Sequence, residues 1–327
     1  MLVSGANGAG KTNLLEALHV GTQGFSPRAR GDVQLIRFGA EAGRVRVAGT
    51  RSHTRFEADV VLSARDARRA RFNGGGLGSA EQLRHELHTL VFTPDRLAVV
   101  KGGPAARRAY VDRSLGRLFP SRAQLPVEYA AAVGQRNAAL RRVAAAHSSR
   151  DALAPWTETV AQLAASLVEA RREVLDLLAP AFAACCDRLR LEGATLGYEG
   201  EPPSVAELEA QLEKDLERGT TGLGPHLHDI RMEAGARDLR SFGSQGEQRI
   251  AVLGLVLAES DVLAERGSPP LVLLDDVLSE LDEERRRALG ELVGSVAQTL
   301  VTTTTPALLP TEPAQSLLVR PGEVVHA

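Results

Sequence analysis

The spacing of apolar and polar residues divides the chain into segments of different kinds. Around residues 45–47 and again over 56–62, apolar residues alternate with polar neighbours, which predicts two antiparallel strands. Residues 89–92 and 271–274 are short, uninterrupted apolar runs, typical of strands buried on both faces. Residues 104 to about 218 have a helical pattern with breaks at prolines and at residues 193–203. After residue 220 strand and helix patterns alternate again, ending in apolar strands at residues 271–274 and 300–301.

These patterns predict an α/β protein with a helical insertion. Residues 1–103 and 220–327 would form two parts of one α/β head, and residues 104–219 a mainly helical second domain between them. The chain has 327 residues, enough to bury a large core, and its 43% hydrophobic and 24% charged residues are typical of globular proteins.

The composition also bears on the location of the protein. No run of eighteen apolar residues exists, so we expect no membrane span. Met1 leads directly into a glycine-rich loop, and we see no signal peptide. The only cysteines, Cys185 and Cys186, are adjacent, which fits neither a disulfide framework nor a zinc site. We therefore expect a cytoplasmic protein.

Residues 5–12, GANGAGKT, fit the phosphate-binding pattern G-x-x-x-x-G-K-[ST]. Glycines let the backbone fold around an anion with its N–H groups pointing inward, and a helix beginning near Lys11 adds its positive end. In this motif the lysine reaches the β- and γ-phosphates, and the hydroxyl of Thr12 ligates Mg²⁺. The residues expected to bind ATP are Gly5, Ala6, Asn7, Gly8, Ala9, Gly10, Lys11, Thr12 and Asn13.

Two carboxylates, Asp275 and Asp276, directly follow the apolar run at residues 271–274. Ligands of open α/β sheets sit at the carboxyl ends of the strands. Asp275 can support Mg²⁺, which prefers oxygen ligands, and Asp276 can orient or deprotonate an attacking water. This pattern is weak alone, but together with the phosphate loop it indicates the second half of an ATP site.

Ser244, Gln245 and Gly246 open another predicted helix, which carries an apolar stripe. A serine hydroxyl and glycine N–H groups at a helix start form a second anion site, although an ordinary capped helix has the same pattern. One nucleotide could be held by both helix starts only if the second came from another chain. We therefore expect ATP to drive formation of a head-to-tail homodimer.

The order of these motifs resembles that of ABC-type ATPase heads, with Ser279 and Asp282 of SELD in the place of the D-loop. Further segments spanning nearly the whole chain resemble the RecF family of bacterial recombination mediators, which are SMC-like ATPases without a long coiled coil. These segments are GKTNLLEAL (10–18), LIRFGAEAGRVRV (35–47), FTPDRLAVVKGGPAARRAYVDR (92–113), GQRNAAL (134–140), TGLGPHLHDI (221–230) and SQGEQR (244–249). The resemblance implies an ABC-type P-loop ATPase head with a mixed sheet and a helical inserted second domain.

The resemblance also implies a function. RecF proteins bind DNA and ATP, dimerise with ATP, hydrolyse it slowly, and act with RecR and RecO to help load recombinase at single-strand gaps. Carried over by position, Lys11 and Asp276 would be catalytic, Thr12 and Asp275 would support Mg²⁺, and residues 244–246 would contact the partner's nucleotide. Thr302 lies in the region of the ABC switch histidine and receives no definite role.

The chain departs from the family pattern in two places. The family usually has further residues before the phosphate loop, and we expect residues 1–3 to be too short for the strand next to the loop and for the adenine-side strands. After residues 224–226 the family usually continues Arg-Asp-Asp, whereas this chain has Leu227, His228 and Asp229. The role of that loop is therefore not carried over.

The net charge of −2 hides an asymmetry along the chain. Residues 1–120 carry 19 Lys and Arg against 10 Asp and Glu, and the remaining residues carry 20 against 31. A basic N-terminal part fits a polyanionic partner, and arginines on solvated faces fit equally well. Within the RecF-like segment Arg107, Arg108 and Arg113 are the candidates for DNA contacts. A second cluster contains Arg65, Arg68, Arg69 and Arg71.

Three other functions share the motifs. The ATPase subunit of an ABC transporter would need a membrane partner and usually a more compact helical lobe. An SMC-like ATPase of another system, such as phage defence, would usually carry a nuclease domain or a long coiled coil. A binding module could also use ATP only to hold two chains together. DNA-stimulated hydrolysis would separate the first from a RecF-like protein.

Overall fold

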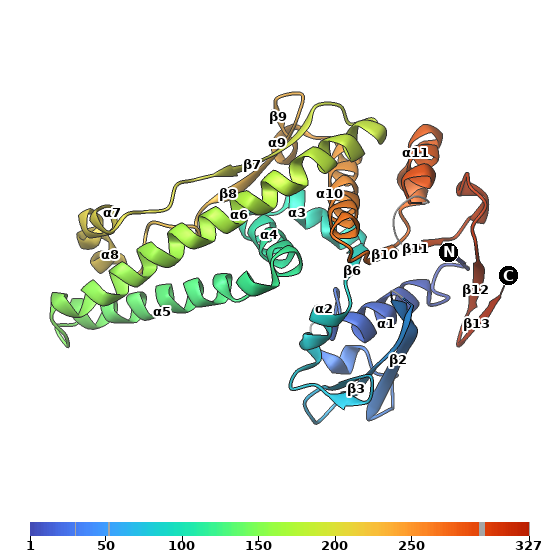
Figure 1. Ribbon diagram of the computed structural model, residues 1–327, viewed down its shortest axis with the longest axis horizontal. Coiled ribbons are helices and arrows are strands. Elements are labelled where there is room, and N and C mark those ends of the chain that lie inside the picture. The colour runs from blue at the N-terminus through green and yellow to red at the C-terminus, as the bar shows by residue number, and fades with distance from the viewer. Residues whose placement is uncertain (30, 52, 294–297, 327) are drawn as a thin grey trace. The chain divides into compact units, whose positions relative to one another are not determined.

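The computed structural model describes residues 1–29, 31–51, 53–293 and 298–326 (Figure 1). The chain forms two compact units. Unit 1 comprises Met1–Leu97, Arg188–Arg190 and Val252–Ala327, and unit 2 comprises Ala98–Asp187 and Leu191–Ala251. The predicted insertion at residues 104–219 lies in unit 2 apart from residues 188–190, and unit 2 also takes in residues 220–251. The three domain ranges stay a prediction.

Unit 1 is built on a six-stranded sheet with the order β13-β12-β1-β11-β10-β6. The four pairings from β6 to β12 are parallel, and β13 runs antiparallel to its neighbour, so the sheet is mixed as expected. The strands are β1 (Leu2–Ser4), β6 (Thr89–Phe92), β10 (Leu271–Leu274), β11 (Thr299–Thr303), β12 (Ser316–Arg320) and β13 (Glu323–His326). The strands predicted at residues 89–92 and 271–274 are confirmed, whereas β12 and β13 were not predicted.

Strand β1 has three residues and still pairs on both sides. Leu2 lies opposite Val301 of β11 and opposite Ser316 of β12. The exposed fractions of Leu2 and Val3 are 4% and 0%, so the strand is part of the core. The first residues were expected to be too short for this strand together with the adenine-side strands, and the strand next to the loop is nevertheless present.

A second, antiparallel sheet of unit 1 has the order β2-β3-β4-β5 and contacts helix α1 (Lys11–Gln23). It consists of β2 (Ala42–Arg51), β3 (Thr54–Ser63), β4 (Arg69–Phe72) and β5 (Gly75–Gly76). The alternating pattern predicted β2 and β3 correctly. Gly21 of α1 lies against Val45 and Val47 of β2, where a side chain would leave only 2.4 Å to Val47. Unit 1 also contains α2 (Leu83–Glu86) and α11 (Glu283–Val293).

Unit 2 is mainly helical, as predicted, and its longest helices are α5 (Leu125–Ala144) and α6 (Ala154–Arg188) (Figure 1). The other helices in this part of the chain are α3 (Ala98–Lys101), α4 (Pro104–Leu118), α7 (Val205–Ala210), α8 (Leu212–Arg218), α9 (Leu239–Phe242) and the start of α10 (Gln245–Glu265). A three-stranded sheet accompanies them, formed by β7 (Ala194–Glu199), β8 (Asp229–Ala234) and β9 (Arg237–Asp238). Strand β7 lies where the sequence predicted only a break between helices.

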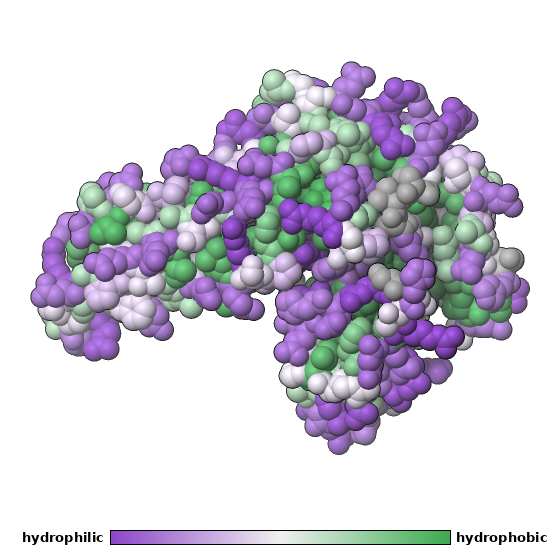
Figure 2. Space-filling model, in the orientation of Figure 1, coloured by the Kyte–Doolittle hydropathy of each residue, from purple (hydrophilic) through white to green (hydrophobic). Residues whose placement is uncertain are grey.

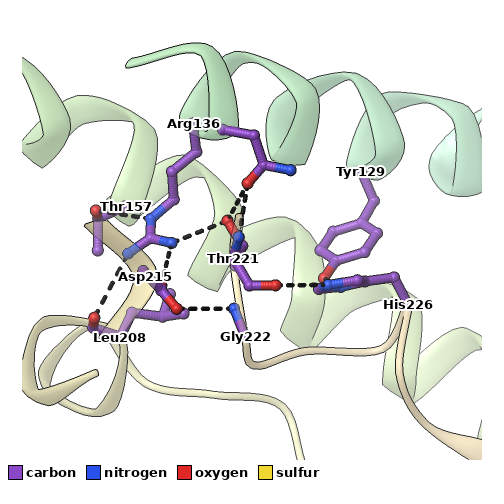
Figure 3. Close-up of polar contacts among 9 residues, drawn as sticks. Tyr129, Arg136, Thr157, Leu208, Asp215, Thr221, Gly222 and His226 are labelled. Carbon is purple, nitrogen blue, oxygen red and sulfur yellow. Dashed lines mark hydrogen bonds and ion pairs between the residues drawn. The ribbon is translucent and has the colours of Figure 1, made fainter. Parts of the chain in front are cut away.

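A buried ion pair joins the elements of unit 2 (Figure 3). The guanidinium of Arg136 on α5 donates to Asp215 Oδ2 at 2.7 Å and to Thr221 Oγ1 at 2.9 Å, and Arg136 and Asp215 have no exposed surface. Asp215 Oδ1 accepts the N–H of Gly222 at 2.9 Å. These bonds fix the beginning of residues 221–229, which we call the strap.

Candidate nucleotide site

The parallel strands β1, β10 and β11 bring the predicted ATP residues to one edge of the main sheet. Ser4 lies opposite Thr303, and Leu274 lies opposite Val301, so the three strands end close together. The phosphate loop follows β1, Asp275 and Asp276 follow β10, and Thr304 follows β11. They line a cavity of about 300 Å³. Its lining residues are Asn7, Gly8, Gly10, Lys11, Thr12, Asn13, Arg28, Asp275, Asp276 and Thr304.

The phosphate loop has the backbone geometry that its glycines predict. Gly8 and Gly10 have φ angles of 78° and 108°, in the left-handed region that favours glycine. Gly10 caps the N-terminus of α1, so the N–H groups of that helix end face the loop. The ammonium of Lys11 donates to the carbonyls of Gly5 at 2.7 Å and Ala6 at 3.0 Å. The lysine thus lies within the curve of the loop.

The side chains of Thr12 and Thr302 converge on Asp275, which is buried with 6% exposed surface. The hydroxyl of Thr12 donates to Asp275 Oδ2 at 3.1 Å, which links the two motifs directly. The hydroxyl of Thr302 donates to Asp275 Oδ1 at 2.8 Å and accepts the backbone N–H of Asp276 at 2.9 Å. Thr302 is fully buried and orients both aspartates, a role that the sequence did not reveal.

Asp276 has an unusual backbone and an unusual side chain. Its φ angle is 47°, which is uncommon for a residue other than glycine and tends to occur at functional sites. Its Oδ1 atom is buried and has no hydrogen-bond partner in the part of the chain that the structure describes. An orphaned buried carboxylate oxygen beside a cavity is a feature that a ligand or an ion would satisfy.

The side chains at this edge fit Mg²⁺. A hard cation needs oxygen donors, and the Thr12 hydroxyl and the Asp275 carboxylate already lie within 3.2 Å of each other. The free Oδ1 of Asp276 adds a further oxygen to the cavity. The chemistry and burial of these donors therefore match the metal that the motif implies.

Arg28 lines the same cavity and was not among the predicted residues. The N–H groups of Arg28 and Ala29 both donate to Ser26 Oγ, at 2.9 and 2.7 Å, and this turn directs the chain past the loop. The Arg28 guanidinium lies 3.9 Å from the carboxylate of Asp95. The polar segment after α1 signalled a loop, but only the fold shows that it adjoins the phosphate loop.

The predicted signature residues lie in unit 2 at the start of α10. Ser244 and Gln245 are exposed. Ser244 Oγ accepts the N–H of Glu247 at 3.2 Å, and the Glu247 carboxylate accepts the N–H of Ser244 at 2.7 Å, which is a capping box. The helix start predicted at Ser244 is confirmed, and its serine caps the helix within the chain.

The D-loop residues lie next to the aspartates in unit 1. Ser279 Oγ donates to the carbonyl of Asp276 at 3.1 Å. Asp282 accepts the N–H of Arg285 at 2.8 Å and so caps the start of α11. Ser279 and Asp282 are both exposed, and each makes a local hydrogen bond. Neither residue lines the cavity.

The arginines predicted to contact DNA are placed differently from one another. Arg107 is only 4% exposed, and its guanidinium is bonded to both oxygens of Asp229 at 2.7 Å and to two carbonyls of unit 2. This placement argues against a phosphate contact by Arg107. Arg108 is half-buried and donates to the carbonyl of His228 at 2.6 Å, and Arg113 is half-buried.

The four arginines of the second cluster also differ from one another in their surroundings. Arg65 pairs with Glu41 at 2.7 Å, and Arg68 pairs with Asp32 and donates to the carbonyl of Gly24. Arg69 and Arg71 are exposed on β4. In the strap, where the chain departs from the family pattern, Asp229 holds Arg107, and His228 Nδ1 lies 2.9 Å from the hydroxyl of Tyr198.

Among the described residues, no helix is long and apolar enough to cross a membrane. The mixed sheet, the loop and the aspartate pair together define an ABC-type P-loop ATPase head. Solved structures agree: the head of an Smc protein bound to the C-winged helix domain of ScpA has the same fold, with a TM-score of 0.59 at 16% identity over the whole of this chain and 89% of that one.

Residues 1–317 match the family described as RecF/RecN/SMC N terminal domain. DNA replication and repair protein RecF from Acidothermus cellulolyticus is 37% identical over 91% of this chain and 85% of its own length. The protein of the same name from Anaeromyxobacter dehalogenans is 38% identical over 95% and 87%. A structure of the recombination mediator protein RecF with ATP superposes with a TM-score of 0.83 at 26% identity, covering 100% of this chain and 91% of that one. The chain belongs to the RecF family.

Proposed function

We propose that the chain is an ATP-dependent DNA-binding protein of recombinational repair. In this proposal ATP binding drives dimerisation on DNA, slow DNA-dependent hydrolysis releases the dimer, and the cycle helps to load recombinase at single-strand gaps. RecR and RecO are the expected partners, since one related structure is of RecF with ATP in the RecFOR pathway. The cytoplasm is the expected location.

The convergence of Lys11, Thr12, Asp275 and Asp276 on one cavity carries this proposal. The loop N–H groups and the Lys11 ammonium would receive the phosphates of ATP. Thr12 and Asp275 would hold Mg²⁺, which neutralises phosphate charge when bound. The Oδ1 atom of Asp276, which has no partner among the described residues, would accept a hydrogen bond from the attacking water.

The backbone of Asp276 fits such a role. Its N–H is held by Thr302, so the carboxylate projects from a fixed point. An aspartate is one methylene shorter than the glutamate that many ABC heads have at this position. A shorter arm that reaches the water less well agrees with the slow hydrolysis that we propose.

The exposed start of α10 supports dimerisation through the nucleotide. Ser244 and Gln245 face solvent, and the helix end offers N–H groups and a positive dipole to an anion. A second chain could place these groups on the γ-phosphate of the first chain's ATP. Replacing Ser244 with a long cation would then block the interface without changing the phosphate loop.

The test is sedimentation velocity on gapped DNA with and without ATP. The unmodified chain should sediment as a dimer only with ATP. Lys11→Ala should lose ATP binding and stay monomeric, whereas Ser244→Arg should keep ATP binding and stay monomeric. A monomer that carries bound, unhydrolysed ATP on DNA would refute the proposal.

A further inference from the structure

Strand β11 ends at the nucleotide site and brings to it a residue that no sequence motif assigned. β11 lies between β1 and β10 in the main sheet, so its carboxyl end lies between the phosphate loop and the two aspartates. Thr302 and Thr303, the last residues of the strand, are buried, whereas Thr304 directly after them is exposed. Thr304 lines the cavity of about 300 Å³, and it is the residue after β11 that a nucleotide bound there would contact.

A turn closed by Thr303 fixes the backbone around Thr304. The hydroxyl of Thr303 accepts the backbone N–H of Thr305 at 3.1 Å and donates to the carbonyl of Thr305 at 3.2 Å. Both bonds span Thr304, so the backbone on either side of this residue is held in place. Thr304 therefore keeps a fixed position beside the cavity.

The hydroxyl of Thr304 is available to a ligand. Within the part of the chain that the structure describes its side chain makes no hydrogen bond, whereas the hydroxyls of Thr12 and Thr302 bond to Asp275. Hydrophilic groups on an open surface, such as those gathered around β2 and β3, are satisfied by water (Figure 2). A hydroxyl at the wall of a polar cavity can instead be satisfied by the ligand that fills the cavity.

The neighbours of Thr304 indicate which part of a nucleotide it would meet. In the phosphate-loop motif the lysine reaches the β- and γ-phosphates, and Mg²⁺ bridges oxygens of the same two groups. Thr12 is bonded to Asp275, so this end of the nucleotide lies on the side of the loop that faces β10. Thr302 contacts both aspartates from β11, and Thr304 follows two residues later at the same edge. The hydroxyl of Thr304 is thus placed for the terminal phosphate.

Most phosphate-binding groups of the cavity do not separate ATP from ADP. The loop N–H groups and the ammonium of Lys11 contact the β-phosphate, which both nucleotides have. Arg28 also lines the cavity, but its long side chain can follow either nucleotide. Thr304 has a short side chain on a held backbone, so its hydroxyl reaches one position only.

We propose that the hydroxyl of Thr304 donates a hydrogen bond to the γ-phosphate of ATP and thereby makes the site discriminate ATP from ADP. The inference rests on the proposed ATP-dependent function and assigns a residue to the discrimination that this function needs. A hydrogen bond to a charged phosphate oxygen stabilises a complex more than a bond between neutral groups does. ADP lacks the γ-phosphate, so this bond is absent from its complex.

Isothermal titration calorimetry with ADP and with a non-hydrolysable ATP analogue, both with Mg²⁺, tests this assignment. The titrations use a Ser244→Arg background, so that ATP-dependent dimerisation does not add to the apparent affinity. Thr304→Val keeps the branched shape of the side chain and removes the hydroxyl. We expect the affinity for the analogue to fall about 10–100-fold, the range of a hydrogen bond to a charged group, and the affinity for ADP to stay unchanged.

Two further variants separate the hydroxyl from its surroundings. Thr304→Ser keeps a hydroxyl at the same place and should keep most of the preference for the analogue. Thr305→Val is the matched control, because Thr305 is also exposed but is not among the residues that line the cavity, and only its backbone bonds to Thr303. It should leave both affinities unchanged. Circular dichroism should be the same for all variants, which verifies the fold.

Several results would overturn the assignment. One is an unchanged ratio of the two affinities in Thr304→Val. Equal losses for ADP and for the analogue are another, because the side chain would then support only the turn, and an equal loss in Thr305→Val is a third. If the chain with Thr304 intact binds neither nucleotide, the proposed function itself fails. If that chain binds both nucleotides equally well, ATP binding stands and only the discrimination by Thr304 fails.

Discussion

The hydroxyl of Thr302 connects the two aspartates that follow β10. It donates to Asp275 and accepts from the N–H of Asp276, and it is shielded from water. Thr302→Val keeps the shape of the side chain and removes both bonds. We expect kcat for ATP hydrolysis to fall about 10–100-fold, as for other residues that orient metal ligands, with a smaller change in the KM for ATP.

Thr303→Val is the matched control for this prediction. Thr303 is equally buried and adjacent on β11, but its hydroxyl donates to the carbonyl of Thr305 at 3.2 Å and does not contact the aspartates. Steady-state kinetics of both variants test whether Thr302 acts by orienting the two aspartates. Equal losses of kcat in the two variants would mean that Thr302 acts only through stability.

Short sequence motifs were sufficient to predict some of the site residues, and they did not reveal others. Lys11, Thr12 and the two aspartates follow from short motifs whose chemistry is local. Thr302 and Arg28 were missed because their roles depend on which strands and loops become neighbours. Arg107 looked like a surface cation on a helix, but its partner Asp229 lies 122 residues away, and no local pattern reports that pairing.

The strap, residues 221–229, depends on the buried ion pair beneath it. Asp215→Ala would leave the buried guanidinium of Arg136 without its anion, and we expect the free energy of unfolding to fall by about 3–5 kcal/mol. The double variant Arg136→Met/Asp215→Leu should recover much of this loss, because it removes both charges. Urea denaturation followed by circular dichroism measures the effect.

The exposed pair Arg150 and Glu213, also in unit 2, provides the comparison. Arg150→Ala should change stability little, because water screens an exposed pair. If Asp215→Ala proves as mild as Arg150→Ala, the buried pair does not hold the strap in the way that we describe.

Two histidines make the strap sensitive to pH. Burial lowers the pKa of His226 and of His228, and the nearby cations Arg108 and Arg171 lower both further. His226 Nε2 lies 3.1 Å from the carbonyl of Thr221, so it carries the proton, and Nδ1 accepts from the hydroxyl of Tyr129. The folded state thus binds the neutral ring.

The sign of the pH dependence follows from the lowered pKa. Between the folded pKa and the unfolded value of about 6.5, the unfolded chain binds more protons, so stability falls as pH falls through this window. We expect the midpoint of urea denaturation to decrease from pH 7.5 towards pH 5.5. His226→Asn/His228→Asn should flatten this decrease, and an unchanged slope would show that other groups cause it.

The patterns predicted long or regular elements better than short ones. Strands β2 and β3 alternate over ten residues each, and α5 and α6 have clear helical periods. Strand β7 contains Gly197 and lies among glycines and prolines, and its partner β8 begins about thirty residues later along the chain. Strands β12 and β13 are five and four residues long. Such strands are stabilised by their neighbours in the sheet more than by their own composition.

At the scale of the whole molecule, one variant should lose ATP hydrolysis and keep ATP-dependent dimerisation. Asp276→Asn keeps the size of the side chain and removes its basic carboxylate. We expect it to bind ATP, to hydrolyse it much more slowly, and to accumulate as an ATP-bound dimer, because release would depend on hydrolysis. Sedimentation velocity and nucleotide release from the same samples report both properties.

Lys11→Ala serves as the reference for this comparison, since it should neither bind ATP nor dimerise. An Asp276→Asn chain that binds ATP and remains monomeric would show that bound ATP does not drive dimerisation. Unchanged hydrolysis in Asp276→Asn would exclude this carboxylate as the group that acts on water.

The order of strands in the main sheet has a consequence for biosynthesis. Strand β1 precedes the phosphate loop, yet both of its neighbours, β11 and β12, lie within residues 299–320. The ribosome therefore releases the loop long before the strands that hold it. A nascent chain cannot complete its nucleotide site until β11 and β12 have been synthesised. Chains cut short by a stop codon before β11 would lack ATP binding altogether, so they should not compete with full-length protein for a partner.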